Sequence, residues 1–180
     1  MNFDAATQIE ASAFTGIVVS QVSLGSCLSI GQAAFYDTAI QELTLPVCAY
    51  IGQSAFLSCR NLNTVYLGSY VRIVNYAFRY CYKLLSLYLL GSSVATLVNI
   101  SAFQSTPISN YTTSTSGVYG SIYVPASLYN DYISATNWVT YSDRFVSLTD
   151  SELSNLQLQF TPSFSNMLPT PDPGIGTVDI

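Results

Sequence analysis

The sequence predicts an α/β-type repeat solenoid of about five coils, with short parallel strands on one face, few helices and a C-terminal capping helix. Two observations predict it. An Ala-Phe pair recurs at intervals of 21, 21, 22 and 25 residues, with an aliphatic residue four positions before each Ala. An apolar-x-apolar triplet follows each of the first four pairs by eight to eleven residues, and a fifth follows a longer insertion. Such self-similarity is the signature of repeat architectures. The pairs begin at Ala13, Ala34, Ala55, Ala77 and Ala102, and the preceding aliphatic residues are Ile9, Ile30, Ile51, Ile73 and Val98.

Each triplet is expected to form a short strand whose two apolar residues point inward, because side chains alternate between the faces of a strand. One unit cannot bury its apolar side alone, but stacked units form a continuous core. Parallel neighbours about 4.8 Å apart then make one sheet along the solenoid. The inward pairs are Val22/Leu24, Leu43/Leu45, Val65/Leu67, Leu87/Leu89 and Ile122/Val124.

Two units show the repeat most clearly: IGQSAFLSCRNLNTVYL at 51–67 and VNYAFRYCYKLLSLYL at 74–89. Both carry Ala-Phe, a Cys three residues on and a Leu three further on. This pattern resembles the leucine-rich repeats of the BspA-like family of bacterial surface antigens, over about residues 9–148. The outer repeats depart from it: Ile17 and Thr38 replace the Cys, and Ile40 shifts the Leu by one. The resemblance implies an extracellular, non-catalytic solenoid that recognises proteins or surfaces.

The chain divides into a solenoid with its cap, residues 1–148, and a C-terminal segment, residues 149–180. After the last triplet, Pro125 and Ser127 predict the start of a helix that runs to about Thr136. Trp138 is expected to seal the open end of the core, since a terminal coil otherwise exposes apolar surface. Leu156–Phe160 alternates like one more strand. Residues 161–180 read as a Pro-rich extended tail that is a candidate for homo-oligomer assembly.

The composition limits the partners and the chemistry. Charged residues are 8% of the chain and the net charge is −5, so five cations are too few for nucleic acid. The start has no signal-peptide pattern, and no stretch suits a membrane span. The sequence contains no His, which excludes Ser-His and Cys-His dyads. Asp150 and Glu152 form a close acidic pair that reads as solvated surface. We therefore expect neither an enzyme nor a cofactor.

The four cysteines form two pairs at equivalent repeat positions, Cys27 with Cys48 and Cys59 with Cys81. Stacked coils place the α-carbons of each pair about 5 Å apart, inside the disulfide range. The favoured interpretation is nevertheless four buried thiols that act as small apolar side chains. Two separated pairs do not make one tetrahedral site, so no metal is expected.

The outward strand positions are the candidate binding surface. Tyr66, Tyr88 and Tyr123 form a tyrosine ladder there, and Tyr is enriched in recognition surfaces. The alternative is that Tyr simply favours strands and packs well across them. The polar members of the surface are Ser23, Thr44, Glu42, Thr64 and Ser86.

Two functions fit these features. The first is a recognition or attachment module on the outside of a bacterium, whose partner is a protein or a cell surface. The alternative is a structural subunit of a phage particle (tail, fibre or capsid decoration) or of another extracellular assembly. A low-charge surface rich in Tyr suits both.

Overall fold

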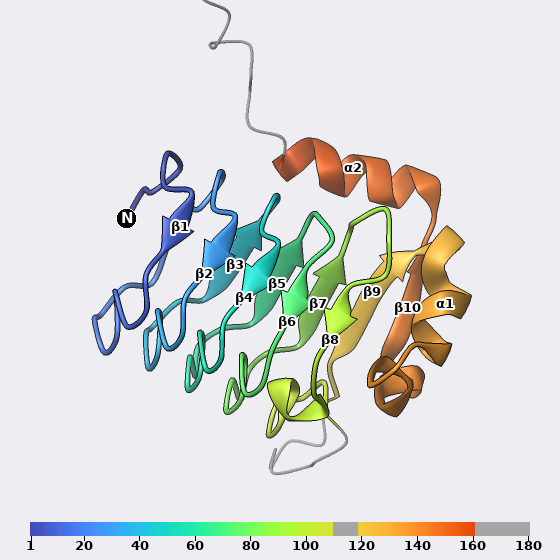
Figure 1. Ribbon diagram of the computed structural model, residues 1–180. Helices are drawn as coiled ribbons and strands as arrows, with labels where there is room; N and C mark the ends of the chain where they lie inside the picture. The colour runs from blue at the N-terminus through green and yellow to red at the C-terminus, as the bar shows by residue number, and fades with distance from the viewer. Residues whose placement is uncertain (110–118, 161–180) are drawn as a thin grey trace, which may run out of the picture.

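The computed structural model describes residues 1–109 and 119–160, which wind into a solenoid with two parallel five-stranded sheets (Figure 1). Four of the five predicted triplets form strands of one sheet, which runs in the order β10-β9-β7-β5-β3; the first triplet, Val22–Leu24, is not a strand of it, and β10 was not predicted. Its strands are β3 (Glu42–Leu45), β5 (Thr64–Leu67), β7 (Ser86–Leu89), β9 (Ser121–Pro125) and β10 (Phe145–Leu148). We call it the main sheet. The predicted class of a repeat solenoid with few helices is confirmed.

Strand alternation buries the expected residues of the main sheet. The inward residues of β3, β5, β7 and β9 are all at most 2% exposed. The first triplet differs, because Leu24 is buried whereas Val22 is only partly buried. Residues 1–3 cover this first coil: Asn2 forms a parallel bridge with Ser23, and the amide of Phe3 donates to the Ser23 carbonyl at 2.9 Å.

A second sheet was not predicted, since strands were expected on one face only. It runs in the order β1-β2-β4-β6-β8 and its strands are two residues long. They are β1 (Gln8–Ile9), β2 (Ser29–Ile30), β4 (Tyr50–Ile51), β6 (Arg72–Ile73) and β8 (Thr96–Leu97). The aliphatic residues before the Ala-Phe pairs are its inward column. Val98, the fifth aliphatic residue of the sequence pattern, is not part of this column, because Ile73 pairs with Leu97 and it is Leu97 that is buried.

The Ala-Phe pairs lie in turns that form a third edge of the solenoid, which we call the turn edge. Consecutive Phe rings stack with centroids 5.0 to 5.5 Å apart, from Phe14 to Phe103. Each turn links to the next coil through its backbone; the amide of Phe56, for example, donates to the Ala77 carbonyl at 2.8 Å. Two residues of each of the first four turns have positive φ, including Ala33 at 53° and Asp37 at 54°. The turn therefore stores backbone strain that inter-coil hydrogen bonds and ring stacking offset.

The cap forms as predicted. The chain passes through a 3-10 turn, Ala126–Leu128, into α1 (Tyr129–Ser134), and then through a 3-10 segment, Trp138–Arg144, into β10. Trp138 is 1% exposed and its ring lies 6.0 Å from Phe103, the last member of the Phe stack. Its indole N–H donates to the Ala95 carbonyl at 2.7 Å, so burial leaves no polar atom unsatisfied there. A short 3-10 turn, Ile100–Phe103, carries the last Ala-Phe pair.

The strand predicted at Leu156–Phe160 is wrong, because Asp150–Phe160 is the helix α2. The segment Thr149-Asp-Ser-Glu152 is a capping box: the Thr149 amide donates to Glu152 Oε2 at 2.8 Å, and the Glu152 amide donates to Thr149 Oγ1 at 3.3 Å. Such a box starts a helix and overrides the short alternating pattern that follows. The helix is also tied to the solenoid, since Gln157 Nε2 donates to the Leu90 carbonyl at 3.1 Å. The Pro-rich tail at 161–180 and its proposed role in assembly lie outside the described residues.

Candidate binding face

The tyrosine ladder lies on the outward face of the main sheet, where the strand register places its members side by side. Tyr66 pairs with Tyr88, and Tyr88 pairs with Tyr123. The ring centroids are 4.6 Å and 4.4 Å apart, with the planes inclined by 17° and 10°. The three rings therefore form one continuous stack across β5, β7 and β9. Each ring restricts its neighbours, so the ladder is a rigid aromatic surface before any partner arrives.

Partial burial within the stack changes the acidity of the phenols. Burial raises the pKa of Tyr66, and the nearby Glu42 carboxylate raises it further. Burial likewise raises the pKa of Tyr88, with smaller contributions from Tyr123 and Tyr66. Tyr66 and Tyr88 consequently stay protonated at neutral pH, and both present a hydroxyl group rather than a charge.

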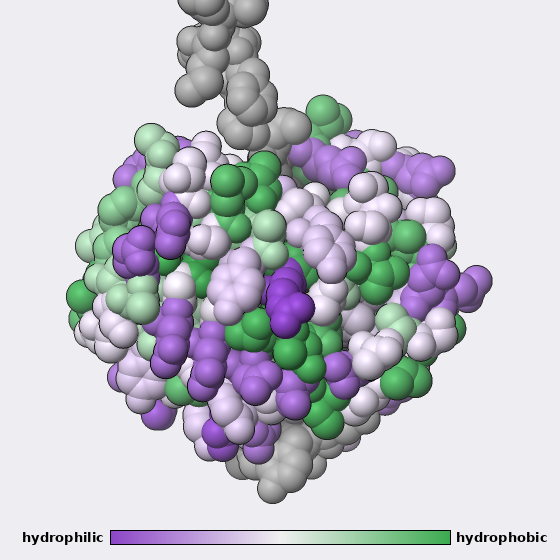
Figure 2. Space-filling model, viewed as in Figure 1, coloured by the Kyte–Doolittle hydropathy of each residue, from purple (hydrophilic) through white to green (hydrophobic). Residues whose placement is uncertain are grey.

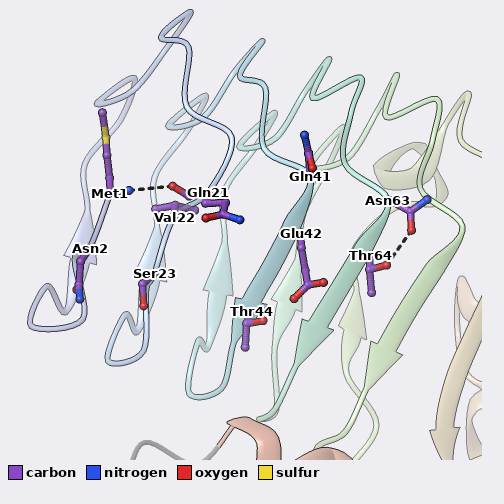
Figure 3. Close-up of a pocket in the computed structure, with 10 residues that line it drawn as sticks. All are labelled: Met1, Asn2, Gln21, Val22, Ser23, Gln41, Glu42, Thr44, Asn63 and Thr64. Atoms are coloured by element: carbon purple, nitrogen blue, oxygen red, sulfur yellow. Dashed lines mark hydrogen bonds between the residues drawn. The ribbon is translucent and has the colours of Figure 1, made fainter.

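The other half of the face, toward the N-terminus, is polar and hollowed. An open groove of about 700 Å³ lies there, and Figure 3 shows its side chains coming from residues 1–2, from residues 21–23, and from β3 and β5 together with the residue just before each strand. Four of the predicted surface residues line it: Ser23, Thr44, Glu42 and Thr64. The remaining lining residues are Met1, Asn2, Gln21, Val22, Gln41 and Asn63.

The groove follows from an interruption of the main sheet. Coils one and two stay joined at their turns, where Phe14 and Phe35 stack at 5.0 Å. On the main-sheet side, the Gln41 amide donates to the Ser20 carbonyl at 3.1 Å. Beyond that bond, no strand pairing links Val22–Leu24 to β3 within the described residues. The two segments thus diverge, and their polar side chains line the opening.

Ser86 continues the polar column toward the ladder. It lies between Thr64 and Ser121 in the register of β5, β7 and β9, and all three residues are partly buried. All eight predicted surface residues therefore lie on one face, with the groove at one end and the ladder at the other. Sequence reasoning missed Val146, which pairs with Tyr123, extends the face onto β10 and is 39% exposed. The sequence offered no such signal, because Phe145–Leu148 does not alternate: Val146 and Ser147 are both exposed between two buried residues.

The cysteines are four buried, free thiols, which agrees with the favoured interpretation. They also act as hydrogen-bond donors. Cys81 Sγ donates to the Phe56 carbonyl of the preceding coil at 3.2 Å, and Cys59 Sγ donates to the Phe35 carbonyl at 3.1 Å. Thr38 fills the same repeat position, but its hydroxyl donates to the Phe35 carbonyl of its own turn at 3.1 Å. Burial raises the pKa of Cys48 to about 12 and also raises that of Cys81, so neither is a thiolate at neutral pH.

Within the described ranges, no three His, Cys, Asp or Glu side chains gather in a way that could hold a metal ion. None of the helices in residues 1–109 and 119–160 is long and apolar enough to cross a membrane.

A search of the curated proteins finds no match for this chain. The family model of the BspA type leucine-rich repeat region matches residues 5–120 in six copies, which is one more than the five Ala-Phe units of the sequence suggest. The matched range includes every strand from β1 to β8, so the repeats of the family are the coils of the solenoid. Because the match covers more than half of the 180 residues, the chain belongs to the BspA-type leucine-rich repeat family.

Proposed function

We propose that this protein is a non-catalytic recognition module that binds an extended segment of a partner protein across the main sheet, outside the cell. Repeats of this family are typically protein-binding, surface-associated and non-catalytic. The observation that carries the proposal is the continuous Tyr66–Tyr88–Tyr123 stack beside a polar groove on the same face.

The two halves of the face supply complementary interactions. The tyrosine stack offers a large apolar area whose side chains lose little conformational freedom on binding, because the rings already restrain one another. The groove offers the side-chain amides of Gln21 and Gln41, each of which can both donate and accept hydrogen bonds. The Asn63 amide beside them already donates to the Lys83 carbonyl and accepts from Thr64. A peptide main chain has the matching donors and acceptors. A partner that runs along the face would therefore place its main chain in the groove and its apolar side chains on the ladder.

The proposal is tested by selecting a random-peptide display library on the immobilised wild-type chain and measuring the selected peptides by fluorescence anisotropy. The test variant changes Tyr66, Tyr88 and Tyr123 together to Ser. We expect it to lose at least about tenfold in affinity, because each anchor of this kind contributes about 1–2 kcal/mol. Tyr36→Ser is the matched control, since this exposed Tyr lies on the turn edge, and it should bind like wild type. Equal binding by a folded triple variant would refute the proposal.

The location outside the cell is supported by the typical surface association of the family and by the low charge of the chain. A surface with few ion pairs changes little when the ionic strength of the surroundings changes. Antibodies against the chain should label intact cells of the source organism, and protease added to intact cells should remove that signal. A signal that appears only after permeabilisation would contradict this location.

The alternative, a structural subunit of a phage particle or another extracellular assembly, is favoured by one observation. The second sheet and its flanking turns expose Leu28, Val47, Tyr50 and Tyr70, each at least 40% exposed. Figure 2 shows apolar and hydrophilic side chains interspersed on the same side of the solenoid. Exposed apolar side chains of this kind suit packing between subunits. Size-exclusion chromatography with light scattering separates the two functions: a recognition module elutes as a monomer, and a structural subunit elutes as an assembly.

A further inference from the structure

Three of the five cations of the chain gather on the turn edge of coils three and four, away from the main sheet. Arg60 and Asn61 occupy the same repeat positions as Tyr82 and Lys83 of the next coil and lie beside them. The Arg60 Cζ lies 5.9 Å from the centroid of the Tyr82 ring, and Lys83 Nζ donates to Asn61 Oδ1 at 3.3 Å. Arg60, Tyr82 and Lys83 are all exposed. With Tyr76, Arg79 and Tyr80 they form what we call the cationic edge.

Arg79 is held rigidly at the centre of this edge. Its Cζ lies 5.0 Å from the Tyr76 ring and 4.4 Å from the Tyr80 ring, so two aromatic rings flank the guanidinium. Its Nη2 also donates to Tyr80 Oη at 2.5 Å. The Nε is buried and has no hydrogen-bond partner among the described residues. The cation is thus fixed in place by stacking and is incompletely satisfied by the protein itself.

The backbone at the two flanking tyrosines is strained. Tyr76 has a φ of 60° and Tyr80 a φ of 63°. The equivalent residues of the preceding coil are Ser54 and Ser58, which are small. A bulky side chain in the left-handed region is a true outlier and costs about 1–2 kcal/mol. The same positions have positive φ in each of the first four turns, so this conformation belongs to the repeat, and here it places both rings beside Arg79.

No carboxylate of residues 1–109 and 119–160 forms an ion pair with the cations of this edge. Among the described residues, the recorded ion pair joins Arg144 to Asp143, and none involves Arg60, Arg79 or Lys83. The chain as a whole carries a net charge of −5, so the positive charge of the cationic edge is opposite in sign to the net charge of the protein. Three cations are too few for a nucleic acid, which binds through many phosphate contacts, and the rest of the chain would repel a dense polyanion.

We infer that the cationic edge is a second binding site, separate from the main sheet, that takes an acidic segment of a partner protein. Carboxylates match the planar fork of a guanidinium and the ammonium of Lys83. The exposed Tyr82 adds the aromatic contact area that peptide-binding sites use, and Tyr and Arg are the residues enriched at the energetic centres of protein interfaces. The inference does not depend on binding at the tyrosine ladder.

A labelled twelve-residue peptide of alternating Glu and Ser is the probe, and its affinity for the full chain is measured by fluorescence anisotropy at low and physiological salt. A peptide with Gln in place of Glu is the matched control probe. We expect the Glu peptide to bind, the Gln peptide to bind at least about tenfold more weakly, and salt to weaken the Glu peptide. The triple ladder variant should bind the Glu peptide like wild type, which separates this site from the proposed function.

The test variant changes Arg60 and Lys83 together to Gln, because both side chains are exposed and their replacement leaves the core intact. It should lose about tenfold in affinity. The matched control is Arg72→Gln, which removes an exposed cation from the second sheet and should change affinity by less than about twofold. Absence of Glu-peptide binding, or equal losses in the Arg72 variant, would overturn the inference. Displacement of the Glu peptide by inorganic phosphate at equal concentration would also overturn it, since the site would then be a general anion site.

Discussion

Replacement of the central member of the Phe stack tests how the solenoid holds together. Phe56 is fully buried, and its ring lies 5.3 Å from both Phe35 and Phe78. A buried aromatic side chain removes at least about 150 Å² of surface from water, which at about 25 cal/mol per Å² is worth about 4 kcal/mol. Phe56→Ala also leaves a cavity between two coils that cannot collapse without shifting their backbones. We therefore expect a loss of about 3–5 kcal/mol in the free energy of unfolding.

A Phe at the end of the array serves as the control for Phe56. Phe14 also stacks on two rings, Phe3 and Phe35, but it is only partly buried. Phe14→Ala should therefore cost about half as much, roughly 2 kcal/mol. Stability is measured by urea unfolding followed by circular dichroism. Because coils contact only their neighbours, the Phe56 variant should also unfold with a smaller denaturant slope or in two steps. Equal losses at the two positions, each with an unchanged slope, would refute the reasoning.

Three further predictions test the turns and the end of the chain. Asp37→Gly should raise the free energy of unfolding by about 1 kcal/mol in thermal melts, because Asp37 has a φ of 54° and Gly adopts that conformation freely, whereas Asp37→Ala should bring no gain. Thr106→Val should cost about 1–2 kcal/mol in urea unfolding, since its hydroxyl donates to the carbonyl of its own turn at 2.7 Å. Thr38→Val should cost less, because the Thr106 hydroxyl also accepts from the Ser109 amide at 3.3 Å, whereas the second contact of the Thr38 hydroxyl is with the weakly hydrogen-bonding Cys59 thiol; a reversed order would contradict this account. Hydrogen bonds from Thr149 lower the folded pKa of Glu152 below 4.5, so its contribution to α2 is present above pH 4.5 and declines as pH falls through that lower pKa. The protection factors of the α2 amides, which compare the measured exchange with the intrinsic rate at the same pH, should therefore fall on acidification. Protection factors that stay constant would contradict the sign.

The main sheet and the cap could be predicted because the same residue type recurs at the same place in each coil. Four of the five triplets pair in register and determine which side chains face the core. Trp138, which follows the last triplet, is the one large aromatic residue expected to cover the end of that core. The tyrosine ladder followed from the same register. Its ring distances confirm only the geometry that alternation already implies.

The second sheet, the groove and α2 could not be predicted from alternation. Strands of two residues carry no period, and they pair because stacked turns hold them in place. The groove depends on where the first two coils diverge, and the residue types of Val22 and Ser23 do not predict that divergence. The end of the chain was decided by the capping box at Thr149 and Glu152, a local hydrogen-bonding signal that is stronger than the alternation of five residues.

Separation of core and surface in this fold explains how two binding sites can coexist on one small solenoid. Each repeat position forms a column along the array, so core columns stay fixed while outward columns vary from coil to coil. The tyrosine ladder and the cationic edge both begin in the third coil, on different sides of the same buried Phe stack. Substitutions in one column should thus leave the other column in place, because the two share backbone but no side-chain contact that the structure records. If the triple ladder variant lost the acidic peptide as well, the columns would be coupled and this division of the surface would fail.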